Sequence, residues 1–336
     1  MITAVLRIAL ALWLCHSLMA RADDDSLAAL KAQFQRPATV PHPDNNPYSP
    51  AKFALGQRLF FDPRLSRDND ISCASCHAPA TGWEDGRQRA VGSDAQIHER
   101  HSPALENLAW ASALLWDGRT PTLESQVWFP LTAHDEMAQD VRELQEELQA
   151  DAAYVAAFDA AYPGKGISLI TVSAAIATFQ REIVSPPAPF DHWVAGDETA
   201  ISDEAKQGFA LFTGKAGCNA CHSGWRLTDD GFHDTGLPAS DDSGRYRFSR
   251  DDGDRNAFKT PGLRNLARRA PYMHDGSLAT LDDVLAHFNG GFTPRPSLSP
   301  KMRHPALADG ELNALRAFLD TLNSDGGSAL PTARPD

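Results

Sequence analysis

The chain has 336 residues, 42% of them hydrophobic, with 31 basic and 44 acidic side chains and a formal net charge of −13 at pH 7. This length suffices for two domains with separate cores. The acidic balance argues against nucleic acid as a partner, because phosphate backbones are bound by Lys and Arg. An acidic surface either keeps a protein soluble or steers a small basic redox protein toward it.

Residues 1–22 are predicted to form a secretory signal peptide. Residues 1–7 are a short basic lead, residues 8–20 are apolar, and Ala20-Arg21-Ala22 fits the small-residue rule for cleavage. The apolar run is too short for a permanent anchor, and no later stretch approaches eighteen uncharged apolar residues. We therefore expect a periplasmic protein without a membrane anchor.

The next segment, residues 23–48, is polar and rich in proline and is predicted to be extended. A helix is predicted to begin at Ser49-Pro50, with serine as the cap and proline in the first turn, and to end at Asp62-Pro63. The first of two pentapeptides of the form Cys-x-x-Cys-His follows this helix. It reads Cys73-Ala-Ser-Cys76-His77.

Further helices are predicted over residues 139–161 and 168–183, from their composition and apolar spacing. The Pro-Pro pair after Ser185 marks a boundary, and residues 185–202 are predicted to be a linker. A helix over residues 203–213 then leads into the second pentapeptide. It reads Cys218-Asn-Ala-Cys221-His222.

A helix followed by this pentapeptide thus occurs twice, which predicts two cytochrome c-like helical domains, each wrapped around one covalent c-type haem. Strand signals are weak, so the predicted fold class is mainly α. We place the N-terminal domain at residues 49–184, the C-terminal domain at residues 203–326 and a tail at residues 327–336. The closing helix, residues 310–323, carries an ordinary core stripe.

Each pentapeptide has the spacing of a c-type haem attachment site. Two such thiols lie on one face of a helical turn, where both can form thioethers to a porphyrin, and His77 or His222 can then bind the iron. A zinc site or a thiol redox pair also uses Cys-x-x-Cys. Zinc would need ligands from pairs far apart in sequence, and a thiol oxidoreductase needs no histidine after each pair. Two covalently bound haem c groups are therefore the favoured interpretation.

Five further segments stand in order around the two pentapeptides. They are Gly56-Gln-Arg-Leu-Phe-Phe-Asp-Pro-Arg-Leu-Ser, Trp116-Asp-Gly-Arg, Glu136-Met137, Lys259-Thr-Pro-Gly-Leu-Arg-Asn265 and Ala270-Pro-Tyr-Met-His-Asp-Gly276. Together they resemble the bacterial di-haem cytochrome c peroxidase and MauG family, and the resemblance covers about residues 48–323.

The resemblance implies a role for particular residues. The haem on His77 looks like the peroxidatic one, with a vacant distal face for hydrogen peroxide, and the haem on His222 like the electron-transfer one. Glu136 falls at the distal acid, where a carboxyl can take a proton from one peroxide oxygen and return it to the other. Gln126 resembles a distal amide, and Trp116 the tryptophan between the haems. Without the resemblance, Glu136 and Gln126 would be interpreted as surface residues and Trp116 as a core residue.

One departure from the family concerns the second haem. Phe288 stands where family members carry a methionine or tyrosine as distal ligand, and a phenyl ring has no lone pair for iron. A helix is predicted over residues 281–288, with Phe288 on its apolar face. The second iron is then open or water-bound, or it recruits Met273, His287 or Met302 as sixth ligand.

Two further departures occur where the family holds a calcium ion between the domains. His101 and Arg269 stand at this position, and histidine is a poor ligand for an oxygen-seeking cation. The Arg269 guanidinium could donate to the same carbonyls. We therefore expect calcium to be lost or weakly bound.

Three functions are compatible with these features. The favoured one is a peroxidase that reduces hydrogen peroxide with electrons from a small cytochrome c or cupredoxin, passed from the C-terminal haem via Trp116 to the N-terminal haem. The alternative is a MauG-like enzyme that oxidatively modifies tryptophan of a partner protein, against which the missing tyrosine ligand at Phe288 weighs. The third is a non-enzymatic di-haem electron carrier, which would need both irons closed by protein ligands.

Overall fold

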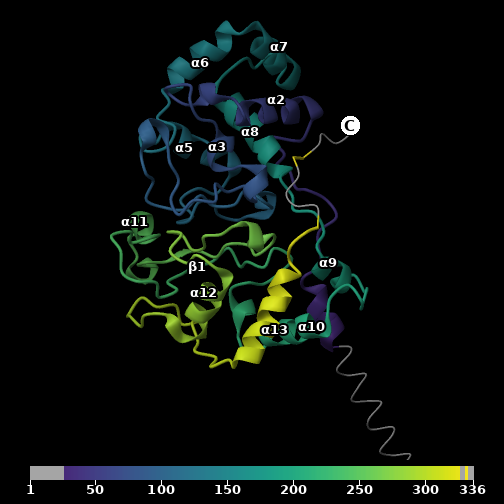
Figure 1. Cartoon of the computed structure of the whole chain (residues 1–336). Helices are drawn as coiled ribbons and strands as arrows, with labels where there is room; N and C mark the ends of the chain where they lie inside the picture. Colours follow the sequence, from purple (N-terminus) through teal and green to yellow (C-terminus); the bar gives the residue numbers. More distant parts are fainter. Residues whose placement is uncertain (1–25, 326–329, 332–336) are drawn as a thin grey trace, which may run out of the picture.

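The computed structural model describes residues 26–325 and 330–331. The predicted signal peptide lies outside the described residues, as does most of the predicted tail. Figure 1 shows two helical bodies stacked along the long axis of the molecule, the N-terminal one above the C-terminal one. Within the described part, the one sheet is the antiparallel pair of β1 (Phe232–His233) and β2 (Phe258–Lys259), so the fold is mainly α as predicted.

The α-helices of the upper body are α2 (Pro50–Phe60), α3 (Cys73–Cys76), α4 (Leu123–Gln126), α5 (Trp128–Thr132), α6 (Val141–Ala150), α7 (Ala152–Ala161) and α8 (Leu169–Arg181). Those of the lower body are α9 (Pro189–Val194), α10 (Asp203–Thr213), α11 (Tyr246–Ser249), α12 (Leu281–Ala286) and α13 (Asp309–Asp320).

Short helical turns connect these elements. They are η1 (Pro63–Leu65), η2 (Pro79–Thr81), η3 (Ser93–Ala95), η4 (Leu108–Trp110), η5 (Cys218–Ala220), η6 (Asp252–Asp254), η7 (Leu266–Arg268) and the π-helical η8 (His287–Gly291). None of the helices in the described part is both long and apolar enough to cross a bilayer.

The two bodies use the same helix crossing. α2 packs on α8 in the upper body, and α10 packs on α13 in the lower one. A Cβ atom on Gly56 would lie 1.9 Å from the carbonyl oxygen of Ala175, and one on Gly208 would lie 1.9 Å from that of Ala314. Glycine is required at both crossings because the helix backbones touch there. The repeated crossing supports the predicted duplication.

Each body has its own hydrophobic core. Aromatic rings dominate both, among them Phe53, Phe60 and Phe179 in the upper core and Phe209, Phe212 and Phe318 in the lower one. These side chains are at most 2% exposed. Burying such a ring contributes roughly 1.5–3 kcal/mol, so each crossing is held by its own cluster.

Two segments differ from their predicted form. Residues 26–32, within the stretch predicted to be extended, are helical, and Phe34 after them is buried in the lower core. The predicted linker contains α9, whose Phe190 and Trp193 are buried in the same core. The ring of Phe34 meets those of Phe190 and Phe209 edge-on, at 5.8 and 5.4 Å between centroids. Both segments therefore pack on the lower body.

The capping residues explain most helix boundaries. The Ser49 hydroxyl accepts a hydrogen bond from the backbone N–H of Lys52 at the start of α2, as predicted, and α10 has the predicted bounds. The stretch predicted over residues 139–161 is two helices, because Asp151 ends α6 and caps α7. Thr280 caps α12, but this α-helix ends at Ala286 and continues as a π-helical turn.

Candidate active site

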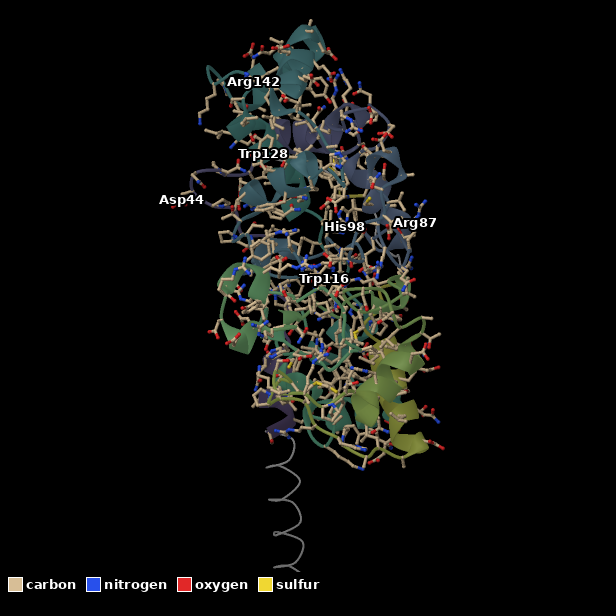
Figure 2. All side chains as sticks on the ribbon, turned by 90° about the vertical axis from the view of Figure 1, so that its left-hand side faces the viewer. Asp44, Arg87, His98, Trp116, Trp128 and Arg142 are labelled. Atoms are coloured by element: carbon tan, nitrogen blue, oxygen red, sulfur yellow. The ribbon has the colours of Figure 1, made fainter. Side chains whose placement is uncertain are left out.

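A cavity of about 390 Å³ extends between the two bodies and is lined by both. Its wall includes the cysteines and histidines of both pentapeptides. The predicted site residues that line it are Cys73, Cys76, His77, Trp116, Gln126, Glu136, Cys218, Cys221, His222, Met273 and Met302. Figure 2 shows Trp116 where the two bodies meet and His98 just above it, in the upper body. The structure thus gathers side chains from far apart in the sequence around one space.

The first pentapeptide forms α3 and is oriented by hydrogen bonds. The Ser72 backbone N–H donates to Oγ of Ser75 at 3.0 Å at the start of the turn, and the Nδ1 atom of His77 lies 3.1 Å from the carbonyl oxygen of Trp83. This contact fixes the ring and leaves Nε2 as the ligand atom for a metal. Burial lowers the pKa of His77, which favours the neutral imidazole that metals bind.

The second pentapeptide repeats this arrangement. It forms η5, and the Nδ1 atom of His222 lies 2.9 Å from the carbonyl oxygen of Leu227. Burial likewise lowers the pKa of His222. Two histidines oriented in the same way, each next to two thiols on one cavity, fit two covalent haem groups.

The thiols themselves argue against the redox-pair alternative. All four cysteines of the pentapeptides are free. Burial raises the pKa of Cys73 to about 12 and that of Cys218 to about 12. A reactive thiol pair needs an easily formed thiolate, which these sites disfavour.

Gln126 and Glu136 lie in the same cavity wall as His77. Gln126 is the last residue of α4 and is 7% exposed, and its buried Oε1 atom has no hydrogen-bond partner among the described residues. The backbone of Glu136 is fixed by the N–H of Ser93, which donates to its carbonyl at 2.8 Å. In this cavity, the amide of Gln126 can hydrogen-bond to a small oxygen compound, and the carboxyl group of Glu136 can exchange protons with it.

Sequence reasoning missed His98. Its Nε2 atom lies 3.3 Å from Oε1 of Glu136 and 3.5 Å from Oδ2 of Asp135, and all three residues line the cavity. The hydrogen bond and charge of Glu136 outweigh burial and raise the pKa of His98 above its usual value. No local pattern marks this histidine, because a loop brings it to a carboxylate far along the chain.

Trp116 joins the two bodies. Its indole N–H donates to the carbonyl of His101 at 2.8 Å, and its own carbonyl accepts from the backbone N–H of Lys259 at 2.7 Å. Its ring lies edge-on to the ring of His274 in the lower body, 6.5 Å between centroids. The indole therefore stands at the junction of the two bodies.

The three candidate side-chain ligands of the second iron differ in where the structure places them. Phe288 lines the cavity, as do Met273 and Met302. The ring of His287 is buried elsewhere, with Nε2 2.8 Å from the carbonyl oxygen of Thr235. The two thioethers are thus better placed than the imidazole.

Arg269 and His101 already have partners at the position implied for calcium. The Arg269 guanidinium donates to Oε2 of Glu106 at 2.8 Å and to the carbonyl of Gly262 at 3.1 Å. The His101 ring lies 2.9 Å from Oε2 of Glu84. A guanidinium that occupies carboxylate and carbonyl oxygens does not fit a calcium site, which needs those oxygens itself.

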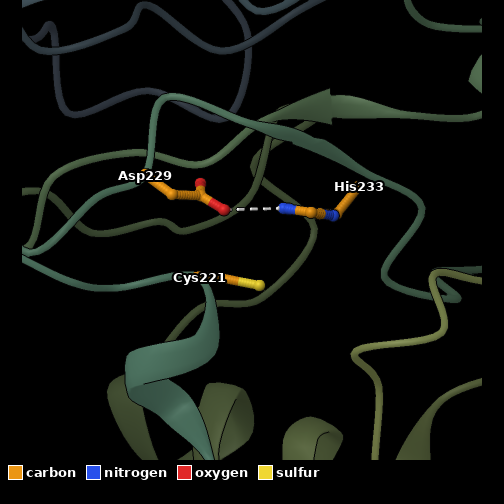
Figure 3. Close-up of side chains that lie close together, drawn as sticks. All are labelled: Cys221, Asp229 and His233. Atoms are coloured by element: carbon orange, nitrogen blue, oxygen red, sulfur yellow. Dashed lines mark hydrogen bonds and ion pairs between the residues drawn. The ribbon is translucent and has the colours of Figure 1, made fainter.

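One small cluster could be mistaken for a metal site. The ligand atoms of Cys221, Asp229 and His233 all lie within 4.8 Å of one another, and Figure 3 shows the contact between Asp229 and His233. The Lys301 ammonium also donates to Asp229, at 2.8 Å. Asp229 is therefore already paired with a cation, and Cys221 belongs to the second pentapeptide. We assign these three residues to the surroundings of that pentapeptide and not to a separate metal site.

Comparisons with known proteins point to one family. The family model for di-haem cytochrome c peroxidase matches residues 50–199. The methylamine utilization protein MauG of Methylorubrum extorquens is 51% identical over 309 residues, covering 91% of this chain and 88% of that protein. A cytochrome-c peroxidase of Denitromonas iodatirespirans is 37% identical over 319 residues, covering 84% of each.

A solved structure also matches. The crystal structure of a MauG-like protein associated with microbial copper homeostasis has a TM-score of 0.81 and 33% identity, and the match covers 88% of this chain and 97% of that one. The fold with two cytochrome c-like domains is thereby confirmed.

Two attachment pentapeptides on one cavity define a c-type haem protein with two redox centres. The chain belongs to the di-haem cytochrome c peroxidase and MauG family. It is accordingly an oxidoreductase of the peroxidase class that acts on peroxide, and the non-enzymatic carrier is set aside.

Proposed function

We propose that this chain is a MauG-like enzyme that uses hydrogen peroxide to oxidise a tryptophan of a partner protein in methylamine utilization. The observation that carries this proposal is the 51% identity over 309 residues with the methylamine utilization protein MauG, against 37% with a cytochrome-c peroxidase. Sequence reasoning favoured the peroxidase; these relatives favour its alternative instead.

The net reaction needs proton transfer at the peroxide. One hydroxylation converts an indole C–H and one H₂O₂ into C–OH and one H₂O. The bound haem groups supply the redox chemistry. Glu136 moves protons at the peroxide oxygens, and the Gln126 amide, with its unpaired oxygen, orients the peroxide by hydrogen bonding.

A partner's tryptophan would be oxidised at a distance, through residues that join the two bodies. Trp116 suits this role because an indole is readily oxidised while remaining an apolar packing element. Hydrogen bonds to His101 and Lys259 hold it from both bodies. A rigid position at the junction is what electron transfer between the two halves requires.

A second candidate is the reduction of hydrogen peroxide with electrons from a small cytochrome c or cupredoxin. Phe288 favours it, because a phenyl ring on the cavity wall replaces the tyrosine ligand implied for a MauG-like second haem. Gln126 and Glu136 serve both reactions. For either function, we place the mature protein in the periplasm, following the predicted signal peptide.

The test uses the purified di-haem protein, hydrogen peroxide and a periplasmic extract of methylamine-grown cells that lack this gene. Peptide mass spectrometry should find an oxidised tryptophan in one extract protein with the wild type and not with Glu136→Gln. Rapid peroxide-dependent oxidation of a small cytochrome c, with no modified tryptophan, would support the second candidate instead.

A further inference from the structure

We propose that His98 and Asp135 form a proton relay that connects solvent with Glu136 and so returns a proton to this carboxylate in each catalytic cycle. The relay rests on the peroxide chemistry that both candidate functions share. His98 and Asp135 have no assigned role, and both line the cavity together with Glu136.

The contacts place one nitrogen between two carboxylates. The Nε2 atom of His98 lies 3.3 Å from Oε1 of Glu136 and 3.5 Å from Oδ2 of Asp135. The same nitrogen can therefore deliver a proton to one carboxylate and take one from the other. Among the described residues, these two acids are the ones that form ion pairs with the ring.

The other ring nitrogen has a partner in either protonation state. Nδ1 of His98 lies 3.2 Å from the backbone nitrogen of Arg100, which can donate to it, and 3.4 Å from the carbonyl oxygen of Arg100, which can accept from it. The ring thus has a hydrogen bond available at Nδ1 whether or not this nitrogen carries a proton. A residue that gains and loses a proton in every cycle needs such surroundings.

Exposure gives the relay a direction. Asp135 is the most exposed of the three side chains, at 52%, against 28% for Glu136 and 20% for His98. Asp135 can therefore exchange protons with water, while the imidazole lies deeper. Proton transfer then runs from water to Asp135, to Nε2 of His98 and on to Glu136.

The loop that carries His98 is docked on the two acids. A Cβ atom on Gly92 would lie 2.3 Å from the carbonyl oxygen of Asp135 and 2.6 Å from that of Glu136, so only glycine allows this approach. The Ser93 N–H donates to the Glu136 carbonyl at 2.8 Å, and the His98 N–H donates to the Ala90 carbonyl at 2.8 Å. The imidazole is held against Glu136 by backbone contacts.

The chemistry of peroxide consumption requires such a supply. Reducing one H₂O₂ to two H₂O takes up two electrons and two protons. When a partner side chain is hydroxylated, the protons released there must return to the peroxide site. In both cases Glu136 must regain a proton after giving one away.

The test compares wild-type di-haem protein with His98→Gln and Asp135→Asn, and uses exposed His192 as the matched control, His192→Gln. Glutamine retains a hydrogen-bond donor but cannot carry a proton. We expect His98→Gln to lower peroxide consumption about tenfold or more, most strongly at high pH. Asp135→Asn should lower it less, and His192→Gln should leave it unchanged.

A second readout does not depend on turnover. The His98 ring, assigned in nuclear magnetic resonance spectra by its loss in His98→Gln, should titrate at lower pH in Glu136→Gln, because the hydrogen bond and charge of Glu136 outweigh burial and raise the pKa of His98. Wild-type rates and pH profile in His98→Gln, or an unchanged pKa of His98 in Glu136→Gln, would overturn the relay. Failure of the wild type to consume peroxide would overturn the proposed function as well. Intact relay behaviour without tryptophan modification would overturn the proposed function alone.

Discussion

Arg269 donates a hydrogen bond to Glu106 at 2.8 Å across the junction of the two bodies, with the Glu106 side chain 1% exposed. Asn265 donates to both oxygens of the same carboxylate, at 2.8 and 3.0 Å. The domains are therefore joined by a protein cation where the family resemblance implies a calcium ion.

Chelation should accordingly leave the wild type unaffected. Treatment with EDTA is expected to change neither the haem absorption spectrum nor peroxide consumption. Arg269→Thr should destabilise the protein by about 3–5 kcal/mol in urea unfolding, because it removes the cation that balances a buried carboxylate. Arg268→Thr, at the exposed neighbour, is the control. Collapse of the wild-type spectrum in EDTA would contradict this interpretation.

Glu136→Gln should lower peroxide consumption by about 10²–10⁴-fold, because an amide cannot accept the peroxide proton. Both haem groups should remain attached, as judged by protein mass and the Soret band. Glu143→Gln, at an exposed position on α6, should behave as the wild type. Unchanged consumption in Glu136→Gln would remove this residue from the mechanism.

Phe288 gives a prediction about the second iron. If no side chain binds the second iron on the side of Phe288, the oxidised wild type should bind added imidazole at two sites per chain, one at each iron. Phe288→Met should bind it at one, because the thioether fills the second site. Phe288→Leu is the matched apolar control. Spectral titration that finds a single site in the wild type would indicate that a side chain already closes this iron, with Met273 and Met302 as the candidates.

The helix crossings should not tolerate a methyl group. Gly56→Ala and Gly208→Ala are each expected to lower the free energy of unfolding by about 1–3 kcal/mol or more, because the added Cβ would overlap a backbone carbonyl. Gly310→Ala, where nothing lies within 4 Å, is the control. Equal stability of all three variants in urea would contradict the crossing geometry.

Low pH should weaken an ion pair that joins the two bodies and so destabilise the protein. The Arg100 guanidinium bridges the bodies to Asp242, at 2.6 and 2.9 Å. Burial opposes ionisation, but Arg100 holds the pKa of Asp242 below its usual value. The stabilisation is therefore present above the unfolded pKa and is lost as pH falls through the lower folded pKa. Asp242→Asn should raise the pH midpoint of acid unfolding followed by circular dichroism, whereas Asp252→Asn should not.

Local sequence signals predicted the helices better than the contacts between distant segments. The serine and threonine caps at Ser49 and Thr280 were readable because capping depends on neighbours within one turn. The packing of Phe34 and α9 on the lower core was missed, since proline-rich stretches look extended when only their composition is known.

Some residues of the candidate site could likewise be predicted from the sequence, and others could not. The pentapeptides carry their spacing in the sequence, and the resemblance indicated Gln126 and Glu136. His98 was missed because its role depends on how Gly92 lets a loop approach Glu136. Likewise, Arg269 was predicted to bind carbonyls, but the pairing with Glu106 could only be read from the structure.

The most direct test of the central claim is peptide mass spectrometry of periplasmic proteins after incubation with the di-haem protein and hydrogen peroxide. The proposal predicts an oxidised tryptophan on one partner protein, formed with the wild type and absent with Glu136→Gln. Sustained peroxide consumption coupled to cytochrome c oxidation, with every partner tryptophan unmodified, would contradict it.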